Sequence, residues 1–239
     1  MMHYLGERQV TALRYRVLGW ILTLALLVPM QALAQSQKSE EAALREYVKE
    51  NTMRLVDRLA EIREFYQEDR EAFYRKMDEA VGEFIAFRRV AARVMGRYAR
   101  QASAEQRDQF VKAFRRSLYD AYGGAAASVD SSDFDLDVES VEINPRNDSR
   151  ATVNLKIITR TNDRYGIAYS MYRSDDGRWL VENIIVEGVN IGLAFRDRFQ
   201  QEIRKRDEDV ARVIEEWSMD QGDLQGLEDA VGTNGNQDS

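Results

Sequence analysis

Cysteine is absent from the sequence, and the only histidine is His3. Thiolates and imidazoles are the side chains most used as nucleophiles and proton carriers near neutral pH. A Cys–His pair and a Ser-His-Asp triad are therefore excluded beyond the first few residues, and so are ordinary zinc sites of cysteine and histidine. No metal site or cofactor is expected. Since no disulfide can form, the stability of the fold must come from its packed core.

Proline is also scarce, with only Pro29 and Pro145 in the chain, which suits long uninterrupted helices. No glycine-rich phosphate-binding loop is present, because Gly123-Gly124 follows a helical pattern and not a strand. Hydrophobic residues make up 44% of the chain and charged residues 31%, as in globular proteins with a sizeable core.

The N-terminal segment has the pattern of an export signal. Arg14 and Arg16 precede an apolar run, Val17–Val28, and Ala32-Leu33-Ala34 provides small residues for cleavage. The run is too short to span a bilayer comfortably, so a signal anchor is the less favoured alternative. We expect residues 1–34 to be a cleaved signal peptide and the exported chain to begin near Gln35.

The charge balance is acidic, with a formal net charge of −7. The predicted signal peptide holds three arginines and one glutamate, so the remaining chain carries −9. Such a chain is repelled by nucleic acid phosphates and by anionic lipid surfaces. We therefore expect no nucleic acid partner, and contact with membranes only transiently and through partners.

The first half of the exported chain has helical periodicity. A helix is predicted from Glu40 to Tyr66, and Asp69 is placed to cap a short helix that follows. A helical hairpin should then run from Met77 to Tyr122. Ser103 and Gln106 have the spacing of a capping box at the start of its second arm, which Gly123-Gly124 should end.

The second half alternates with the period of strands. Four segments are expected, around residues 134–143, 153–157, 167–172 and 179–186, with a possible slip after Val138. Short turns join them, including Asp175-Asp176-Gly177, which favours an antiparallel sheet. Asn190 should cap a final helix, a second short one should end at Trp217, and residues 220–239 have the composition of a disordered acidic and polar tail.

This order predicts an α+β fold, in which helices wrap a curved antiparallel sheet of roughly four strands. The expected shape is a cone, like that of NTF2-like proteins, which can enclose an apolar pocket. Pockets of this kind bind apolar ligands, because an empty apolar cavity is costly.

Several motifs resemble the MlaC family, also called toluene-tolerance auxiliary proteins. The first block comprises Gly96-Arg97-Tyr98, Ser103, Gln106-Arg107, Phe110, Phe114 and Leu118-Tyr119. The second comprises Trp179, Val186-Glu187-Gly188-Val189-Asn190, Phe195-Arg196 and Phe199, and Asp69 with Phe73 matches the family's Asp-x-x-x-Phe element. The resemblance covers Leu44 to Trp217. The chain departs from the family at Glu182-Asn183, where Tyr-Asp is usual, and at Asn190, where Ser is usual.

The resemblance implies that residues 35–219 form a periplasmic phospholipid carrier, the substrate-binding component of an ABC-type lipid transport system in a Gram-negative bacterium. Family members shuttle glycerophospholipids between an outer-membrane lipoprotein complex and an inner-membrane ABC transporter complex, which maintains outer-membrane lipid asymmetry. A carrier of this kind needs no catalytic group.

Apolar residues from both halves of the chain are the candidate lipid-binding lining, although each one taken alone is as readily an ordinary core residue. They are Phe84, Phe87, Val94, Tyr98, Phe114, Leu118, Tyr122, Val153, Leu155, Tyr169, Met171, Trp179, Val181, Ile185, Val189 and Phe195. We expect Leu155 and Val181 to face Phe114 and Leu118 across the pocket.

Four arginines lie on the outer side of the hairpin's first arm, at Arg89, Arg93, Arg97 and Arg100. The simplest interpretation is a solvated helix face. The alternative is a docking stripe for an acidic protein partner.

Two other classes of protein fit the sequence less well. One is an isomerase-type enzyme on a cone-shaped α+β fold, with Glu187, Asp120 or Glu182 as the base and Tyr169 or Tyr98 as the proton donor. The other is a protein-interaction adaptor whose core is filled.

Overall fold

The computed structural model describes residues 28–128 and 130–218. Residues 1–27 of the predicted signal peptide and the predicted tail, 220–239, lie outside the described residues. The chain divides into two compact units, and the boundary falls between Ala43 and Leu44, inside helix α2 (Val28–Ile62). In the first unit the described residues are helical, and the Gln37 side-chain amide donates to the Glu41 carboxylate at 3.2 Å.

The second unit, from Leu44 onward, contains the rest of the fold. After α2 its helices are α3 (Phe65–Glu68), α4 (Arg70–Gly82), α5 (Phe87–Met95), the 3-10 helix η1 (Gly96–Arg100) and α6 (Ala104–Ser128). Across the part of the chain that the structure describes, no helix combines the length and the apolar character needed to cross a membrane.

The predicted helix caps are confirmed. The Asp69 carboxylate accepts a hydrogen bond from the Ala72 backbone N–H at 2.9 Å, which starts α4. Ser103 and Gln106 form the reciprocal capping box before α6. The Gln106 side chain accepts from the Ser103 N–H at 2.8 Å, and the Ser103 hydroxyl accepts from the Gln106 N–H at 3.1 Å.

Two predictions about the hairpin are wrong. Its first arm is not one helix, because the chain leaves α4 at Gly82 and pairs with a strand at Ile85 before α5 begins. The second arm does not stop at Gly123-Gly124, since α6 continues to Ser128. Gly123 is required for packing: a Cβ there would lie 2.5 Å from Cζ of the buried Phe73 ring.

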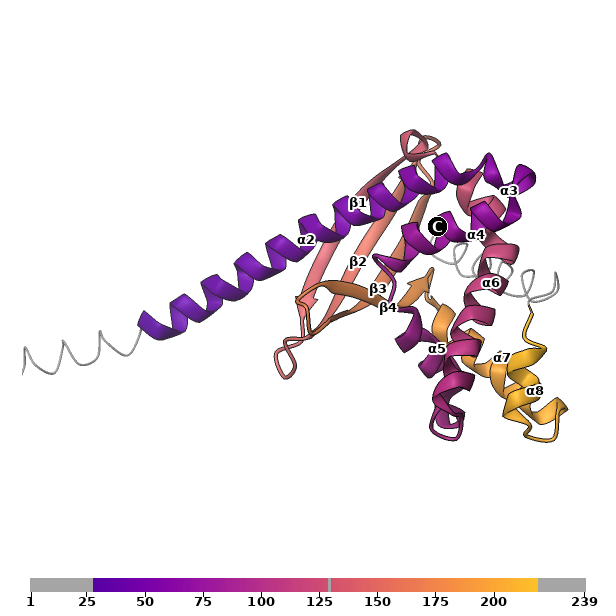
Figure 1. Cartoon of the computed structure of the whole chain (residues 1–239). Helices are drawn as coiled ribbons and strands as arrows, with labels where there is room; N and C mark the ends of the chain where they lie inside the picture. The colour runs from indigo at the N-terminus through magenta and orange to yellow at the C-terminus, as the bar shows by residue number, and fades with distance from the viewer. Residues whose placement is uncertain (1–27, 129, 219–239) are drawn as a thin grey trace, which may run out of the picture. The chain divides into compact units, whose positions relative to one another are not determined.

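The sheet has five antiparallel strands in sequence order, preceded by the 3-10 turn η2 (Ser131–Asp133). The strands are β1 (Phe134–Ile143), β2 (Arg150–Thr159), β3 (Arg164–Arg173), β4 (Trp179–Val186) and β5 (Val189–Asn190) (Figure 1). Four were predicted; the fifth was missed because it contains only two residues. The slip expected after Val138 is confirmed as a register shift between Val138 and Ser140.

A second register shift lies in β4. Val181 pairs with Met171 of β3, and Asn183 pairs with Ser170, so Glu182 is an extra residue without a partner on β3. Because side chains alternate between the faces of a sheet, this bulge exchanges the faces that the following β4 residues occupy. Val181 and Ile184 therefore lie on the inner face, which carries the sheet's buried residues, and Ile185 lies on the outer face.

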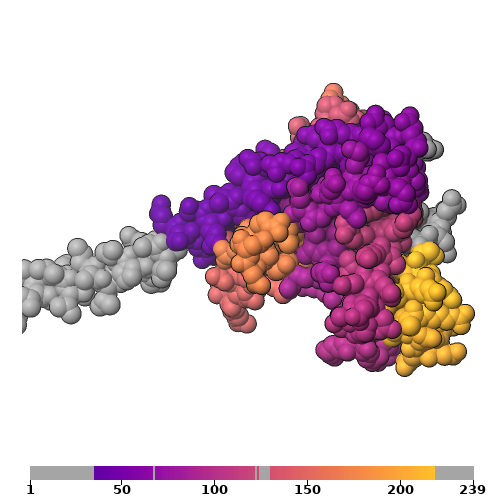
Figure 2. All heavy atoms as spheres, viewed as in Figure 1, coloured from indigo at the N-terminus to yellow at the C-terminus, as the bar shows by residue number. Residues whose placement is uncertain are grey.

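Two helices follow the sheet, α7 (Ile191–Lys205) and α8 (Val210–Glu215). The predicted cap of α7 is confirmed, because the Asn190 side chain accepts from the Leu193 N–H at 3.0 Å. Helix α8 packs on α6, and the space-filling view shows the yellow C-terminal segment directly against the magenta α6 (Figure 2). The order of helices, sheet and helices confirms the predicted α+β class.

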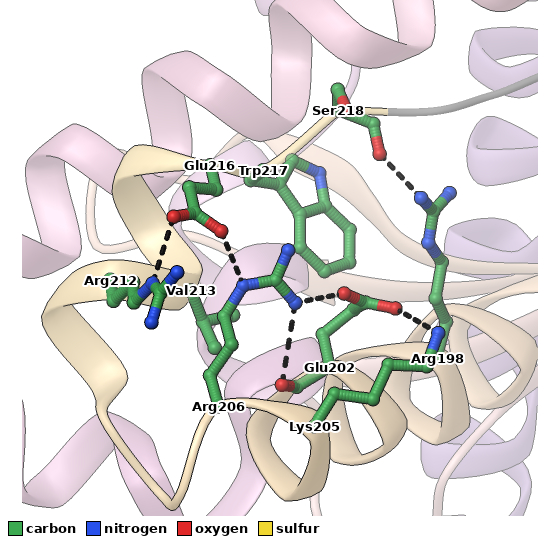
Figure 3. Close-up of a pocket in the computed structure, with 9 residues that line it drawn as sticks. All are labelled: Arg198, Glu202, Lys205, Arg206, Arg212, Val213, Glu216, Trp217 and Ser218. Carbon is green, nitrogen blue, oxygen red and sulfur yellow. Dashed lines mark hydrogen bonds and ion pairs between the residues drawn. The ribbon is translucent and has the colours of Figure 1, made fainter.

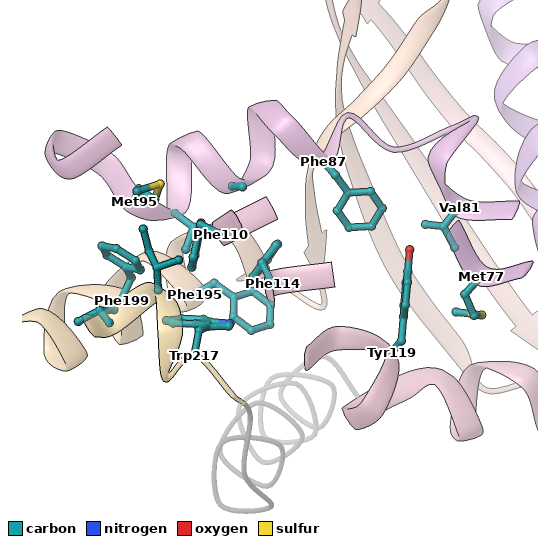
Figure 4. Packing of buried hydrophobic residues seen from close by; sticks show 14 of the residues in the cluster. Met77, Val81, Phe87, Met95, Phe110, Phe114, Tyr119, Phe195, Phe199 and Trp217 are labelled. Carbon is teal, nitrogen blue, oxygen red and sulfur yellow. The ribbon is translucent and has the colours of Figure 1, made fainter. Parts of the chain in front are cut away.

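The buried apolar residues form two clusters and not one. The helical cluster brings together the C-terminal end of α2 with α4, α5, α6, α7 and α8, and its densest part packs Phe110, Phe114, Phe195, Phe199 and Trp217 (Figure 4). The sheet cluster joins the inner face of the sheet to Leu44 and Val48 of α2 and to Phe84. Leu55 and Ile85 are partly buried and pack against both clusters.

Candidate ligand-binding site

The inner face of the sheet is a continuous apolar surface. Side chains from its three central strands are buried there: Val153, Leu155, Tyr169, Met171 and Val181. They lie on one face because Val153 pairs with Tyr169 and Met171 pairs with Val181 across neighbouring strands.

Helix α2 and the α4–α5 connection cover this face. Leu44 and Val48 lie on one side of α2 at a spacing of four residues, and both pack into the sheet cluster. The Phe84 ring meets the Tyr169 ring edge-on, with centroids 6.0 Å apart. The candidate lining did not include Leu44 and Val48, although their helical spacing marked them as core residues.

Few polar groups enter this surface. The Tyr47 hydroxyl of α2 donates to the Trp179 carbonyl at 2.8 Å, which ties α2 to the first residue of β4. Burial raises the pKa of the Tyr169 hydroxyl, a shift that the neighbouring Thr52 hydroxyl opposes. Tyr169 is therefore a neutral hydroxyl among aliphatic and aromatic side chains.

The predicted lining residues from the helices belong to the other cluster. Phe87, Val94, Tyr98, Phe114 and Phe195 are buried in the helical cluster, where Leu118 also packs. The expectation that Leu155 and Val181 face Phe114 and Leu118 is wrong, because Leu155 and Val181 pack in the sheet cluster, with Phe84 and α2. The side chain of Tyr122 lies outside the described residues.

Four of the predicted lining residues lie on the last two strands, β4 and β5. Trp179 and Val181 join the sheet cluster. Val189 of β5 pairs with Val186 and is half-buried. Ile185 pairs with Ala168 and is placed by the bulge at Glu182 on the outer face, away from Tyr169.

The arginine stripe is divided between different partners. Arg89 and Arg93 form ion pairs with the buried Glu182. Arg97 lies 3.6 Å from the Glu208 carboxylate and donates to the Tyr98 hydroxyl, whereas Arg100 is exposed. The stripe is therefore not a uniform solvated face, since its first two members pack toward the sheet.

The carboxylates considered as enzymatic bases are each held by donors. Asp120 accepts from Arg70 at 2.9 Å and also from the Tyr74 hydroxyl. Glu187 accepts from the Gly166 backbone N–H, and Glu182 is ion-paired with arginines. Within residues 28–128 and 130–218, no group of acidic side chains is arranged to hold a metal ion.

The fold and its inner face define an α+β protein in which helices cover the apolar face of an antiparallel sheet. The chain belongs to the MlaC protein family, which it matches over residues 49–219. It is 28% identical over 172 residues to the toluene tolerance protein ttg2D of Pseudomonas putida, an alignment that covers 72% of this chain and 78% of that protein.

A solved structure shares the fold. It is the phospholipid-binding protein of Ralstonia solanacearum in complex with a phospholipid, with a TM-score of 0.58 and 19% identity. The match covers 81% of this chain and 97% of that one.

Proposed function

We propose that the protein is a phospholipid carrier that holds acyl chains against the inner face of its sheet. The observation that carries the proposal is the continuous apolar surface of Val153, Leu155, Met171 and Val181, in which the buried Tyr169 hydroxyl is neutral. Membership of the MlaC family and a fold shared with a phospholipid-binding protein support it.

The energetics suit a shuttle. Burial of a methylene group stabilises by about 0.8 kcal/mol, so two acyl chains of about 15 carbons gain roughly 20 kcal/mol relative to water. A bilayer hides the same chains equally well, and the net affinity relative to a membrane is near balance. Directional transfer then needs partners that bind the loaded and empty states differently.

The finer proposal places this carrier in the periplasm, after cleavage near Ala34. There it exchanges glycerophospholipid with an inner-membrane ABC transporter complex and an outer-membrane lipoprotein complex, and so maintains lipid asymmetry. Sequencing the N-terminus of the protein from cells tests the location, and a start near Gln35 is expected.

A carrier also accounts for the side-chain chemistry better than an enzyme does. Glu182 and Asp120 are each already paired with a guanidinium, so neither carboxylate is an unengaged base. The carrier needs neither group for proton transfer.

The test compares two neighbouring positions on β2. Leu155 is buried on the inner face, whereas Lys156 points outward and pairs with Glu139. In Leu155→Trp the indole occupies the space of an acyl chain, so phospholipid per protein should fall several-fold. Lys156→Trp is the matched control and should keep the wild-type lipid content. Native mass spectrometry of the purified proteins measures bound lipid, beside a thermal melt of delipidated samples.

The two measurements separate a ligand site from a packed core. Overpacking a filled core typically costs 1–3 kcal/mol. If Leu155→Trp melts much earlier while its folded fraction carries normal lipid, the inner face is ordinary core and the proposal is wrong. If the purified protein never carries phospholipid, the result would instead favour the alternative of a protein-interaction adaptor with a filled core.

A further inference from the structure

Glu182 is enclosed by three arginines on the outer face of the sheet. Arg89 Nε lies 2.9 Å from Glu182 Oε2, and Arg93 Nη2 lies 2.6 Å from Oε1. Arg150, at the start of β2, also pairs with Oε1. The Glu182 side chain is 3% exposed, whereas those of the arginines are 33–47% exposed. We call these four residues the Glu182 cluster.

Positive charge is in excess within the Glu182 cluster, because one carboxylate faces three guanidinium groups. Burial lowers the pKa of Arg93, and the charge of Arg89 lowers it further. Burial also lowers the pKa of Arg150, and the charges of Arg89 and Arg93 lower it further. An added anion would offset this repulsion in a partly desolvated place, where charge interactions are stronger than in water.

Two hollows adjoin the cluster, and both have Arg93 and Glu182 in their walls. The larger, of about 650 Å³, is also lined by Arg146, Arg150 and Glu142. The smaller, of about 470 Å³, runs between α5 and the start of α7. Both volumes lie within the range of about 300–1,000 Å³ that is usual for small-molecule sites.

The smaller hollow adds further positive potential. Arg196 lines it, and so do Asn190 and Gly192 at the N-terminus of α7. The Gly192 and Leu193 N–H groups already donate to the side chains of Asn183 and Asn190, so the positive potential here comes from Arg196. Gly96, with φ +59°, lets Arg196 lie close, since a Cβ at Gly96 would be 3.3 Å from Arg196 Nε.

We propose that these two hollows, which share Arg93 and Glu182 in their walls, form a second ligand site that binds a phosphate-class oxyanion. Four arginines, Arg93, Arg146, Arg150 and Arg196, face two carboxylates, Glu142 and Glu182, so the walls retain a positive surplus. Guanidinium groups bind phosphate through paired N–H donors, which gives geometric preference as well as charge. A lipid headgroup and free phosphate share this chemistry.

The charged side chains of this site lie apart from the acyl-chain surface, although the larger hollow also reaches Ala151 and Met171 of the inner face. Arg150 pairs with Tyr172 on the outer face, whereas the next residue, Ala151, pairs with Met171 on the inner face. The proposal of an oxyanion site can therefore be wrong while the carrier proposal is right, and the carrier proposal can be wrong while the oxyanion site is right.

The experiment titrates the purified exported chain with inorganic phosphate and with glycerophosphoglycerol, a soluble phosphodiester headgroup. Ionic strength is held constant with chloride, and binding is followed by calorimetry and by arginine side-chain NMR signals. The test variant is Arg146→Gln with Arg196→Gln, since neither arginine belongs to the Glu182 cluster. Arg164→Gln, an exposed position at the start of β3, is the matched control.

Saturable binding of either probe is expected, weakened about tenfold or more by the double variant, because a hydrogen bond to a charged group contributes on that scale. The control should bind as the wild type does. Preference for glycerophosphoglycerol identifies a headgroup as the ligand, and preference for phosphate identifies the free ion. Binding that is non-saturable, or equal in the double variant, overturns the proposal. Loss of acyl-bound lipid from the folded double variant would overturn the separation of the two sites.

Discussion

Ile85 and Val181 form a lone parallel bridge that joins the break between α4 and α5 to strand β4. The Ala86 N–H donates to the Val181 carbonyl at 2.9 Å, and the Val181 N–H donates to the Phe84 carbonyl at 2.9 Å. These hydrogen bonds hold Phe84 over the sheet cluster and leave Phe87 in the helical cluster. The connection between α4 and α5 thus assigns two aromatic residues three positions apart to different cores.

Removing one hydrogen-bond donor from this bridge should lower the stability of the protein. Ala86→Pro deletes the N–H that bonds to Val181, and leaves a buried carbonyl without its partner. A loss of about 1–3 kcal/mol in the free energy of unfolding is expected, measured by urea denaturation. Ala86→Gly keeps the N–H and is the control, with an expected cost below about 1 kcal/mol. Equal losses in the two variants would mean that the bridge contributes little.

Gly123→Ala should destabilise the protein, although alanine is the better helix former. The new methyl group would lie 2.5 Å from Phe73 Cζ, in a region where the ring is fully buried. Overpacking of this kind typically costs about 1–3 kcal/mol. Gly82→Ala is the control, because the nearest atom to its Cβ would be Arg115 Nη2 at 3.7 Å. A thermal melt distinguishes them, and a stabilised Gly123→Ala would contradict the packing argument.

Phe110→Ala should separate stability from ligand binding. The Phe110 ring lies 5.0 Å from that of Phe199 and 5.2 Å from that of Trp217, in the densest part of the helical cluster (Figure 4). Deleting a buried phenyl ring costs about 3–5 kcal/mol. Phospholipid per folded protein should stay at the wild-type value, because this cluster lies apart from the inner face. Lys112→Ala, at an exposed position of the same helix, should change neither quantity.

The ion pairs at the C-terminal end of α7 should make stability depend on pH (Figure 3). Lys205 donates to the Glu202 carboxylate at 2.8 Å, and Arg206 pairs with the same group. The Lys205 hydrogen bond, opposed by burial and reinforced by Arg206, lowers the pKa of Glu202 below its ordinary value of 4.5. A depressed pKa gives stability that is fully present above that value and lost as pH falls through the folded-state pKa.

Glu202→Gln should therefore lower stability at pH 7 by about 1 kcal/mol and flatten its decline at acid pH. Denaturation midpoints measured from about pH 7 to about pH 3 test this, with the exposed Glu61→Gln as the control. A variant whose acid decline matches that of the wild type would show that other carboxylates govern the effect.

Local signals in the sequence predicted the helix starts well. The caps at Asp69, Ser103 and Asn190 depend on residues two or three positions away, so their spacing was sufficient. The role of Gly123 was misjudged because it is set by Phe73, fifty positions earlier, and no local pattern contains that contact. The break at Ile85 was missed for the same reason, since its partner lies on β4.

The inner face was predicted where the strands alternate regularly. Val153, Leu155, Tyr169 and Met171 were correctly grouped because β2 and β3 pair without interruption. Ile185 was misplaced because Glu182 interrupts the alternation of β4, and a charged residue inside an apolar strand was considered as a site and not as a bulge. The Glu182 cluster was missed because its arginines come from α5 and β2.

The bulge at Glu182 also sets which face of the sheet each following residue of β4 occupies. If Glu182 paired with Ser170 as a regular ladder residue, Ile185 would turn toward the inner face and Ile184 away from it, whereas deleting Glu182 would leave both on their present faces and remove the carboxylate from between its arginines. A one-residue gap at Glu182 in a sequence alignment is therefore compatible with the same inner face. The side chains that β4 presents to the sheet cluster are thus set by a residue that has no partner on β3.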